Sequence, residues 1–402
     1  MTDLRGKAFS TRAVHAGERA PQTGATPVVS PITPSVAYTY EDMDELDQVF
    51  ANARPGYVYA RYTGPAQSAF EAAVASLEEG EAAMAFASGM AAIHAALLAA
   101  GVRAGGSVVA AFDLYGATYS LLVRLFASLG VTTRLVDVGD LAAVEAALKE
   151  TGPAALVVET ISNPLLKVAD VPALASLAHR YGAQLLVDNT FATPWLFRPL
   201  GAGADYAIHS ATKYLSGHGD VLAGVVVTSA ANRARLFELN KLVGSVLGPF
   251  EAWLALRGLK TLPLRVPAQF ATAMKLAAWL AARPEVARVN YPGLPTHPQH
   301  ALAERLFGAQ GYGGVLSFEL KGADRSRAFR FMDALQLCQP ATTLGDIYTL
   351  VLHPATSSHR SLSEAERAQV GIGEGLVRLS TGIEAPADLL ADLDQALESL
   401  GA

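Results

Sequence analysis

The chain has 402 residues, of which 51% are hydrophobic and only 17% are charged. Ordinary globular chains are about 25% charged, so this composition indicates a large buried core and excludes extensive disorder. The 31 basic and 37 acidic residues give a net charge of −6 and form no Lys/Arg-rich run, which argues against a nucleic-acid partner.

The chain has a single cysteine, Cys338. One thiol can form neither an internal disulfide nor a cysteine-based metal site. We therefore expect the cytoplasm and no metal. The first twenty residues hold charges without an apolar run, so a secretory signal is not indicated. The most apolar stretch, Ala82–Val102, is interrupted by Ser88, Gly89 and His94, and we interpret it as a buried strand and helix rather than a membrane span.

Residues 1–60 are rich in proline, tyrosine and threonine and show little periodicity. This pattern predicts an extended N-terminal arm that contacts a neighbouring subunit. From about Phe70 to Ser229, short apolar runs alternate with helical patterns, which predicts an α/β domain over residues 61–256 with a mostly parallel sheet. The predicted strands are Ala82–Phe86, Ser107–Ala111, Thr132–Val136, Ala155–Glu159, Gln184–Asp188, Asp205–His209 and Gly224–Thr228. Ligands gather at the carboxyl ends of such strands.

Residues 257–402 have a different pattern, typical of a smaller α+β domain. A long apolar helix is predicted over Ala268–Ala282, and a strand over Gly314–Leu320. An amphipathic helix follows at Ala387–Leu400, with Pro386 as its starting residue.

A lysine, Lys213, follows the strand that ends at His209. An amine at a strand end can be desolvated, which lowers its pKa and lets it form a Schiff base with an aldehyde. On its own, Lys213 would be read as a surface lysine, and His209 as a hydrogen-bonded core histidine rather than a base.

Asp188 ends the apolar strand Gln184–Asp188 and would be buried without an obvious partner. Buried carboxylates are rare unless they are paired. The pyridine nitrogen of pyridoxal phosphate would supply such a partner, because a carboxylate beside it keeps the ring protonated. A strand-end aspartate alone would more often be a helix cap.

Ser88, Gly89 and Met90 lie where a strand gives way to a helix. The free amides and positive dipole of a helix start favour an anion. With the hydroxyls of Ser210 and Thr212, this turn is a plausible phosphate cradle, although such a turn alone usually only caps the helix.

These residues resemble the transsulfuration, or cysteine and methionine metabolism, family of pyridoxal-phosphate enzymes, which includes methionine γ-lyases, O-acylhomoserine sulfhydrylases and cystathionine synthases and lyases. The resemblance covers nearly the whole chain. The matching segments are Tyr57–Tyr62, Ala87–Met90, Leu114–Gly116, Val158–Thr160, Asn163–Pro164, Val187–Thr190, His209–Tyr214, Tyr291–Leu294 and Val377–Ser380. The resemblance implies the fold type I of pyridoxal-phosphate enzymes, with helices on both faces of a mostly parallel sheet and a smaller C-terminal α+β domain.

The resemblance also implies a role for each matching residue. Lys213 would carry the cofactor and move protons, and Asp188 would pair with the pyridine nitrogen. Gly89 and Met90, in the turn begun by Ser88, would hold the phosphate together with Ser210 and Thr212. Tyr59 and Arg61 would reach it from the adjacent subunit, so that a homodimer is the catalytic unit and a homotetramer the usual assembly.

The remaining roles implied by the resemblance concern the substrate. Tyr115 would stack on the cofactor ring and serve in acid/base catalysis, although it could instead be a core aromatic. Asn163 would lie near the cofactor hydroxyl. Arg378 would grip the substrate α-carboxylate, a bidentate task for which lysine is a poor substitute. Thr343 is expected beside the substrate together with Asn163.

Within the family, the prediction is γ-elimination or γ-replacement on a homoserine-derived or methionine-like substrate. Members that handle cystathionine usually carry a glutamate where this chain has Tyr348. Methionine γ-lyases typically have a cysteine where Ala117 stands, and many sulfhydrylases carry an insertion near residue 240 that is absent here. A cystathionine γ-synthase or γ-lyase is the alternative within the family.

Two hypotheses come from other classes. An aminotransferase of the same fold would convert its cofactor stoichiometrically to the amine form. A non-catalytic relative kept for binding fits poorly with the joint presence of Lys213, Asp188, Tyr115 and Arg378.

Overall fold

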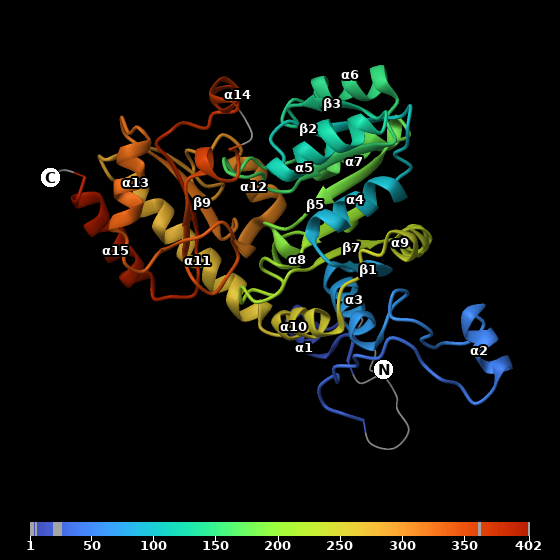
Figure 1. Ribbon diagram of the computed structural model, residues 1–402. Coiled ribbons are helices and arrows are strands. Elements are labelled where there is room, and N and C mark those ends of the chain that lie inside the picture. Colours follow the sequence, from blue (N-terminus) through green and yellow to red (C-terminus); the bar gives the residue numbers. More distant parts are fainter. Residues whose placement is uncertain (1–3, 5, 19–25, 361–362, 401–402) are drawn as a thin grey trace.

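The computed structural model describes residues 4, 6–18, 26–360 and 363–400. Within them, the larger sheet has seven strands in the order β1-β7-β6-β5-β4-β2-β3 (Figure 1). They are β1 (Ala82–Phe86), β2 (Ser107–Ala111), β3 (Thr132–Val136), β4 (Ala155–Glu159), β5 (Gln184–Asp188), β6 (Tyr206–Ser210) and β7 (Gly224–Thr228). Strand β7 runs antiparallel to β1 and β6, and the other pairs are parallel. The predicted mostly parallel sheet is confirmed.

Most of the strands form where the sequence has short apolar runs, and these runs are buried on both faces of the sheet; the edge strand β3 is the exception, with Thr132 and Arg134 exposed. In β1, Ala83 and Ala85 pack into one core cluster while Met84 and Phe86 pack into the other, as the alternation of side chains along a strand requires. Strand β6 begins one residue later than predicted. Asp205 precedes it, and its Oδ2 accepts hydrogen bonds from the backbone N–H of Leu185 (2.7 Å) and from His179 Nε2 (2.9 Å).

Helices cover both faces of this sheet, as predicted. One face packs against α4 (Gly89–Ala99), α6 (Leu141–Thr151), α7 (Val171–Arg180) and α9 (Ala230–Val243), and the other against α3 (Pro65–Glu78) and α10 (Pro249–Leu259). Shorter helical segments are α5 (Gly116–Ser120), which continues into a π-helical turn at Leu121–Phe126, α8 (Thr193–Leu196), and 3-10 turns at Leu200–Ala202, Gly308–Gln310 and Pro354–Thr356.

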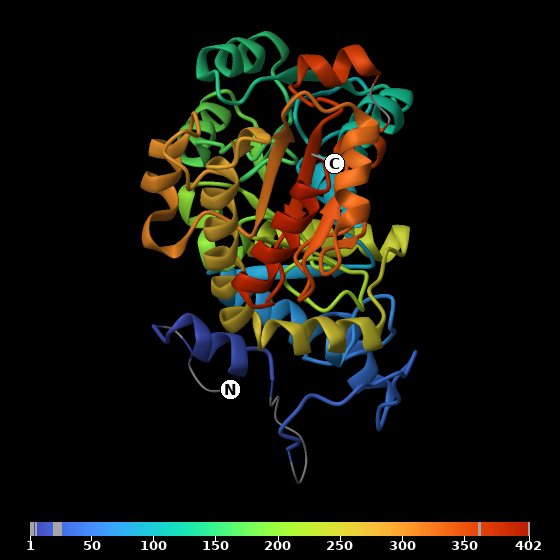
Figure 2. The ribbon, with the colours of Figure 1, turned by 90° about the vertical axis from the view of Figure 1, so that its left-hand side faces the viewer.

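The smaller sheet has the order β10-β11-β12-β9-β8 among the described residues (Figure 2). Its strands are β8 (Val286–Asn290), β9 (Val315–Leu320), β10 (Gln339–Pro340), β11 (Leu350–Leu352) and β12 (Leu376–Ser380), and its helices are α11 (Leu262–Ala281), α12 (His300–Phe307), α13 (Arg325–Ala334), α14 (Glu364–Gln369) and α15 (Pro386–Glu398). Helix α11 begins six residues before the predicted Ala268 and passes through Pro267, because Leu262 and Val266 on the earlier turns are fully buried.

The N-terminal segment has two parts. Helix α1 (Phe9–His15) packs on α3 and α11, with Ala13 buried. The chain beyond residue 26 leads away from the sheets to α2 (Met43–Phe50), as Figure 1 shows. This second part agrees with an extended arm, and its contact with a neighbouring subunit stays a prediction. In the described part of the chain, no helix combines the length and hydropathy needed to cross a membrane.

Candidate active site

A cavity of about 390 Å³ lies at the carboxyl ends of β4, β5 and β6 and faces β12 of the smaller sheet. This is the edge at which ligands of parallel sheets bind. Ten of the predicted site residues line it: Ser88, Gly89, Met90, Tyr115, Asn163, Asp188, Ser210, Thr212, Lys213 and Arg378. Segments more than 200 residues apart in the sequence therefore meet in one place.

The amine of Lys213 lies in this cavity, just after β6. Its Nζ donates a hydrogen bond to Thr343 Oγ1 at 2.7 Å. Burial, and next the nearby Arg378 guanidinium, lowers the pKa of Lys213 to about 8. Roughly a tenth of the amine is therefore unprotonated at pH 7, far more than for an ordinary lysine, and able to attack an aldehyde. Thr343 contacts the lysine itself, while its neighbours Thr342 and Leu344 line the cavity.

Two carboxylates stand side by side at the cavity floor. Asp188 ends β5 and Glu159 ends β4, and the two are register partners in the parallel sheet. Asp188 Oδ1 accepts hydrogen bonds from Thr190 N (3.0 Å) and Thr190 Oγ1 (2.5 Å). Burial raises the pKa of Asp188, while these two hydrogen bonds and the charge of His209 oppose the rise. A cationic ring N–H beside Asp188 would compensate its burial.

The start of α4 provides the opposite polarity. Ser88 caps the helix by accepting a hydrogen bond from the backbone N–H of Ala91 at 3.1 Å. A Cβ on Gly89 would lie 2.8 Å from the Cβ of Ser210, so only glycine lets the helix start approach β6 this closely. The Thr212 hydroxyl accepts a hydrogen bond from the backbone N–H of Ala223 at 2.9 Å. This helix start fits a phosphate group.

Arg378, on β12, is a buried guanidinium in the cavity wall. Its Nη1 donates to Asn163 Oδ1 at 3.1 Å and its Nη2 to the carbonyl of Thr343 at 2.9 Å. Its Nε has no hydrogen-bond partner, and no ion pair found in the described part of the chain includes it. Burial lowers the pKa of Arg378 to about 10. A buried cation that has only neutral partners is suited to bind a carboxylate from a ligand.

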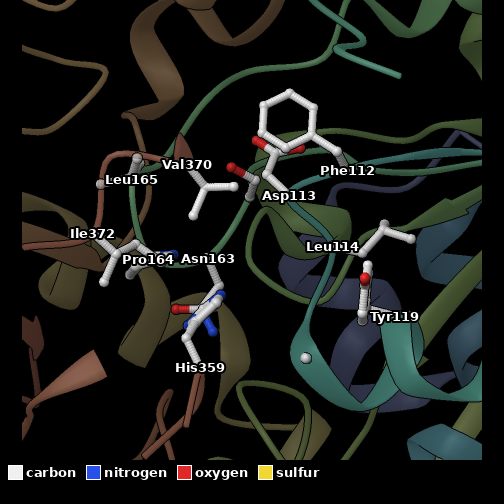
Figure 3. Close-up of a pocket in the computed structure, with 12 residues that line it drawn as sticks. Phe112, Asp113, Leu114, Tyr119, Asn163, Pro164, Leu165, His359, Val370 and Ile372 are labelled. Carbon is white, nitrogen blue, oxygen red and sulfur yellow. The ribbon is translucent and has the colours of Figure 1, made fainter. Parts of the chain in front are cut away.

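Tyr115 and Asn163 flank the cavity on two turns. Tyr115 is 43% exposed, so it is not a core aromatic, and its backbone N–H donates to Glu159 Oε1 at 2.6 Å. Asn163 also lines a second cavity between the two sheets, where Figure 3 shows it next to His359. The sequence interpretation gave Glu159 no role of its own. The available signal was that the apolar runs of β4 and β5 both end in a carboxylate.

The structure does not bring Tyr59 and Arg61 to this chain's own cavity. The Arg61 guanidinium instead donates to the carbonyl of Lys241 and lies over the ring of Tyr62, 5.3 Å from the ring centre to Cζ. Tyr59 is 41% exposed. Their approach to the phosphate of a second copy remains a prediction.

His209 and Cys338, two further residues weighed from the sequence, are both buried. His209 Nε2 lies 2.6 Å from Glu78 Oε1, and both side chains are at most 1% exposed, which confirms a hydrogen-bonded core histidine. Cys338 is free and buried. The described residues contain no cluster of three or more His, Cys, Asp or Glu side chains arranged to hold a metal ion.

The donor set fits pyridoxal phosphate on its chemistry. Lys213 offers an amine of lowered pKa, Asp188 a buried carboxylate, and the start of α4 an anion site. These three groups match the aldehyde, the ring nitrogen and the phosphate of that cofactor.

Comparison with known proteins gives the same answer. Residues 10–398 match the family model described as "Cys/Met metabolism PLP-dependent enzyme". The chain is 44% identical to an L-methionine γ-lyase of Pseudomonas putida, over 97% of each chain. It is 43% identical to an O-succinylhomoserine sulfhydrylase of Pseudomonas aeruginosa, over 99% of this chain and 97% of the relative.

Among solved structures, the fold is similar to that of cystathionine γ-synthase from Xanthomonas oryzae pv. oryzae in complex with cystathionine. The TM-score is 0.91, at 35% identity and with 98% of each chain covered. Because the family model matches residues 10–398, which is almost the whole chain, the chain belongs to the Cys/Met metabolism family of pyridoxal-phosphate-dependent enzymes.

Proposed function

We propose that this enzyme catalyses γ-elimination or γ-replacement on amino acids with an uncharged γ-substituent, of the methionine or O-acylhomoserine type. The observation that carries the proposal is the chemistry of the cavity wall. Away from the strand-end carboxylates, its charged groups among the described lining residues are Lys213 and Arg378. The rest of the wall is uncharged. It combines hydroxyl groups, such as those of Thr190, Ser357 and Ser358, with the apolar side chains Ile93, Ile161, Phe191, Leu222, Leu344 and Leu352.

This wall accepts a thioether or ester more readily than a second charged amino-acid end. One end of the substrate, its α-carboxylate, would pair with Arg378. A distal ammonium would be desolvated beside apolar side chains, which is costly without a carboxylate partner. Tyr348, where cystathionine-handling members usually carry a glutamate, is 57% exposed. The residue after Tyr348 is paired with a glutamate, but that glutamate, Glu384, already accepts from Thr349 N (2.6 Å) and Thr349 Oγ1 (2.8 Å).

Bound pyridoxal phosphate supplies an electron sink that stabilises carbanionic character at the substrate carbons. In this proposal Asp188 holds the proton on the pyridine nitrogen. Lys213, when its amine is free, would move protons between neighbouring substrate carbons, and Thr343 would orient its Nζ. Tyr115 stacks on the ring and is the candidate that protonates the leaving γ-substituent. The phosphate rests at the α4 start, with Ser88, Gly89, Met90, Ser210 and Thr212 around it.

The test is a product assay on the purified holoenzyme. It receives L-methionine alone, O-acetylhomoserine plus sulfide, O-succinylhomoserine plus sulfide or cysteine, and cystathionine alone. Release of 2-oxobutyrate and methanethiol from methionine, or of homocysteine from an O-acylhomoserine, supports the proposal. The fastest turnover with cystathionine, as substrate or product, would refute the assignment of the wall. Conversion of the cofactor to its amine form in step with a keto acid would indicate an aminotransferase.

We further propose that a homodimer is the catalytic unit, further paired into a tetramer, in the cytoplasm. The support is that Tyr59 and Arg61 do not line their own chain's cavity and follow a segment, from residue 26 to α2, that leads away from the sheets (Figure 1). Apolar side chains on this segment are exposed, among them Val28 (72%) and Met43 (74%). Such surface is normally covered by a partner. The free, buried Cys338 is compatible with a reducing compartment.

Co-expression of two inactive variants tests the shared site. Lys213→Ala keeps an intact arm, and Arg61→Ala keeps an intact lysine. If Arg61 serves the other subunit, a mixed dimer has one complete site, and random pairing restores about a quarter of wild-type activity. If Arg61 serves its own subunit, the mixture stays as inactive as the separate variants.

A further inference from the structure

Glu159 is the charged residue at the cavity floor that the proposed chemistry leaves unused. It ends β4, is 8% exposed, and lines the cavity next to its register partner Asp188. Side chains of register partners in a parallel sheet project from the same face. The pyridine nitrogen needs one carboxylate, and the fold places two there. Glu159 must therefore either serve another purpose or destabilise the protein as a second buried charge.

The contacts of Glu159 connect both turns that flank the cavity. Its Oε1 accepts the backbone N–H of Tyr115 at 2.6 Å, and the backbone of Asn163 also donates to its carboxyl group. Tyr115 is the ring-stacking candidate, and Asn163 holds Arg378 through its side-chain oxygen at 3.1 Å. One carboxyl group thus joins the turn over the cofactor to the turn that supports the carboxylate-binding arginine.

The electrostatic surroundings bear on the charge that Glu159 carries. Burial first, and the Asp188 carboxylate second, raise the pKa of Glu159 well above its usual range, and Asp113 raises it further, while the hydrogen bonds from the Tyr115 and Asn163 backbone oppose the rise without cancelling it. Asp113 is itself compensated by Lys167, 3.9 Å away. On the far side of Asp188, the charge of His209 favours the ionised form of that aspartate rather than of Glu159. Two adjacent buried carboxyl groups do not both ionise readily.

We propose that Glu159 is a positioning residue that acts as a neutral carboxylic acid, holding the Tyr115 and Asn163 turns in place while Asp188 alone carries the negative charge. The inference rests on the proposed function, because it assumes that Tyr115 and Arg378 contact cofactor and substrate. A neutral acid can accept both backbone hydrogen bonds through its carbonyl oxygen. It does so without adding a second negative charge beneath the ring.

Glu159→Gln and Glu159→Ala separate the two parts of the proposal. Glutamine is neutral and keeps the accepting oxygen, so it should leave the pH midpoint of the visible cofactor band unchanged and kcat/KM within about threefold of wild type. Alanine removes the acceptor, so both turns loosen and kcat/KM should fall by about 10- to 100-fold. Glutamine restores the volume as well as the acceptor, so Glu159→Met, which fills a similar volume without an accepting oxygen, separates the two and should lose as much kcat/KM as alanine.

Glu71 is a matched control. It is also a buried glutamate, accepts a backbone N–H (Ala85, 2.9 Å), has a pKa raised to about 7 by burial, and does not line the cavity. Glu71→Gln and Glu71→Ala should leave the midpoint of the band and the KM unchanged, although alanine lowers stability.

Two results would overturn the inference. A midpoint that moves by about one pH unit or more in Glu159→Gln would mean that Glu159 is an anion coupled to the ring. Wild-type kinetics in a folded Glu159→Ala holoenzyme would mean that it positions nothing. The spectral titration needs no substrate, so it stands even if the product assay assigns a different reaction.

Discussion

Arg378 Nη1 lies 3.1 Å from Asn163 Oδ1, although the two residues are 215 positions apart, one on β12 of the smaller sheet and the other on the turn after β4 of the larger sheet. The second amino group of the guanidinium is held by the carbonyl of Thr343 at 2.9 Å. Both partners are neutral, so they fix the orientation of the guanidinium and leave its charge for a ligand.

The first prediction follows from that arrangement. Arg378→Lys should raise KM for the amino-acid substrate about 30-fold or more, equivalent to about 2 kcal/mol, because a single ammonium cannot reproduce a bidentate contact. Steady-state kinetics measure the change. A decarboxylated substrate analogue is the control, since its binding should differ little between the two proteins. Equal losses for both ligands would mean that Arg378 is structural.

A second prediction concerns the pH at which the apoenzyme takes up its cofactor. Only the unprotonated amine of Lys213 attacks the aldehyde, and its pKa is lowered to about 8. The rate at which the visible band appears should therefore rise up to about pH 8 and then level off. A rate that kept rising to pH 10 would show an ordinary lysine. Lys213→Ala should form no such band at any pH.

A third prediction concerns Thr343, whose hydroxyl accepts from Lys213 Nζ at 2.7 Å. Thr343→Val keeps the shape and removes the acceptor, so it should lower kcat about tenfold by freeing the lysine, whereas Thr343→Ser should stay near wild type. Both variants are compared by steady-state kinetics at several pH values. If serine and valine lose equally, the methyl group matters and the hydrogen bond does not.

The buried pair of Glu78 and His209 provides a stability prediction. Glu78 Oε1 accepts from His209 Nε2 (2.6 Å) and from Asn189 Nδ2 (2.9 Å). Glu78→Ala leaves both buried donors without an acceptor and should lower the free energy of unfolding by about 3–5 kcal/mol. Urea midpoints at fixed protein concentration measure it. The adjacent Glu79, 57% exposed in its side chain, pairs with Arg12 and Arg198 at the surface, and Glu79→Ala should cost less than about 1 kcal/mol.

The single thiol allows a fifth prediction. Burial, and then the neighbouring Asp392 carboxylate, raises the pKa of Cys338, and the residue is 1% exposed. The native enzyme should therefore resist iodoacetamide at neutral pH and take up one equivalent after denaturation. Mass spectrometry counts the label. Rapid modification of the folded protein would contradict this placement.

The larger sheet was predictable because most of its strands are five-residue, mainly apolar runs that end near turn residues; only β3, which contains Thr132, Thr133 and Arg134, departs from this pattern. The smaller sheet was less so. Strand β8 is partly exposed and β10 has two residues, so neither produces a clear periodicity. Helix α1 was missed because its short pattern depends on packing against α3 and α11. The predicted start of helix α11 was too late, because a proline such as Pro267 is typical of a helix start. The preceding turn is buried, and the helix continues through Pro267.

The site residues were predictable from strand ends and from the family resemblance, and the structure gathers ten of them around one cavity. Their individual roles stay predictions. The place of Glu159 could not be read from the sequence, because it depends on the register of β4 against β5 and on a hydrogen bond to the turn at Tyr115. Neither is encoded in any local pattern.

The location of the two cations has a final consequence. Lys213 follows a strand of the larger sheet, and Arg378 lies on a strand of the smaller one. The packing of the two sheets thus sets the spacing between the amine and the carboxylate that a substrate must present. An α-amino acid has one carbon between these groups, whereas a β-amino acid has two. Selection for α-amino acids would then be a property of how the sheets dock, and mutations remote from the cavity that shift this docking would relax it.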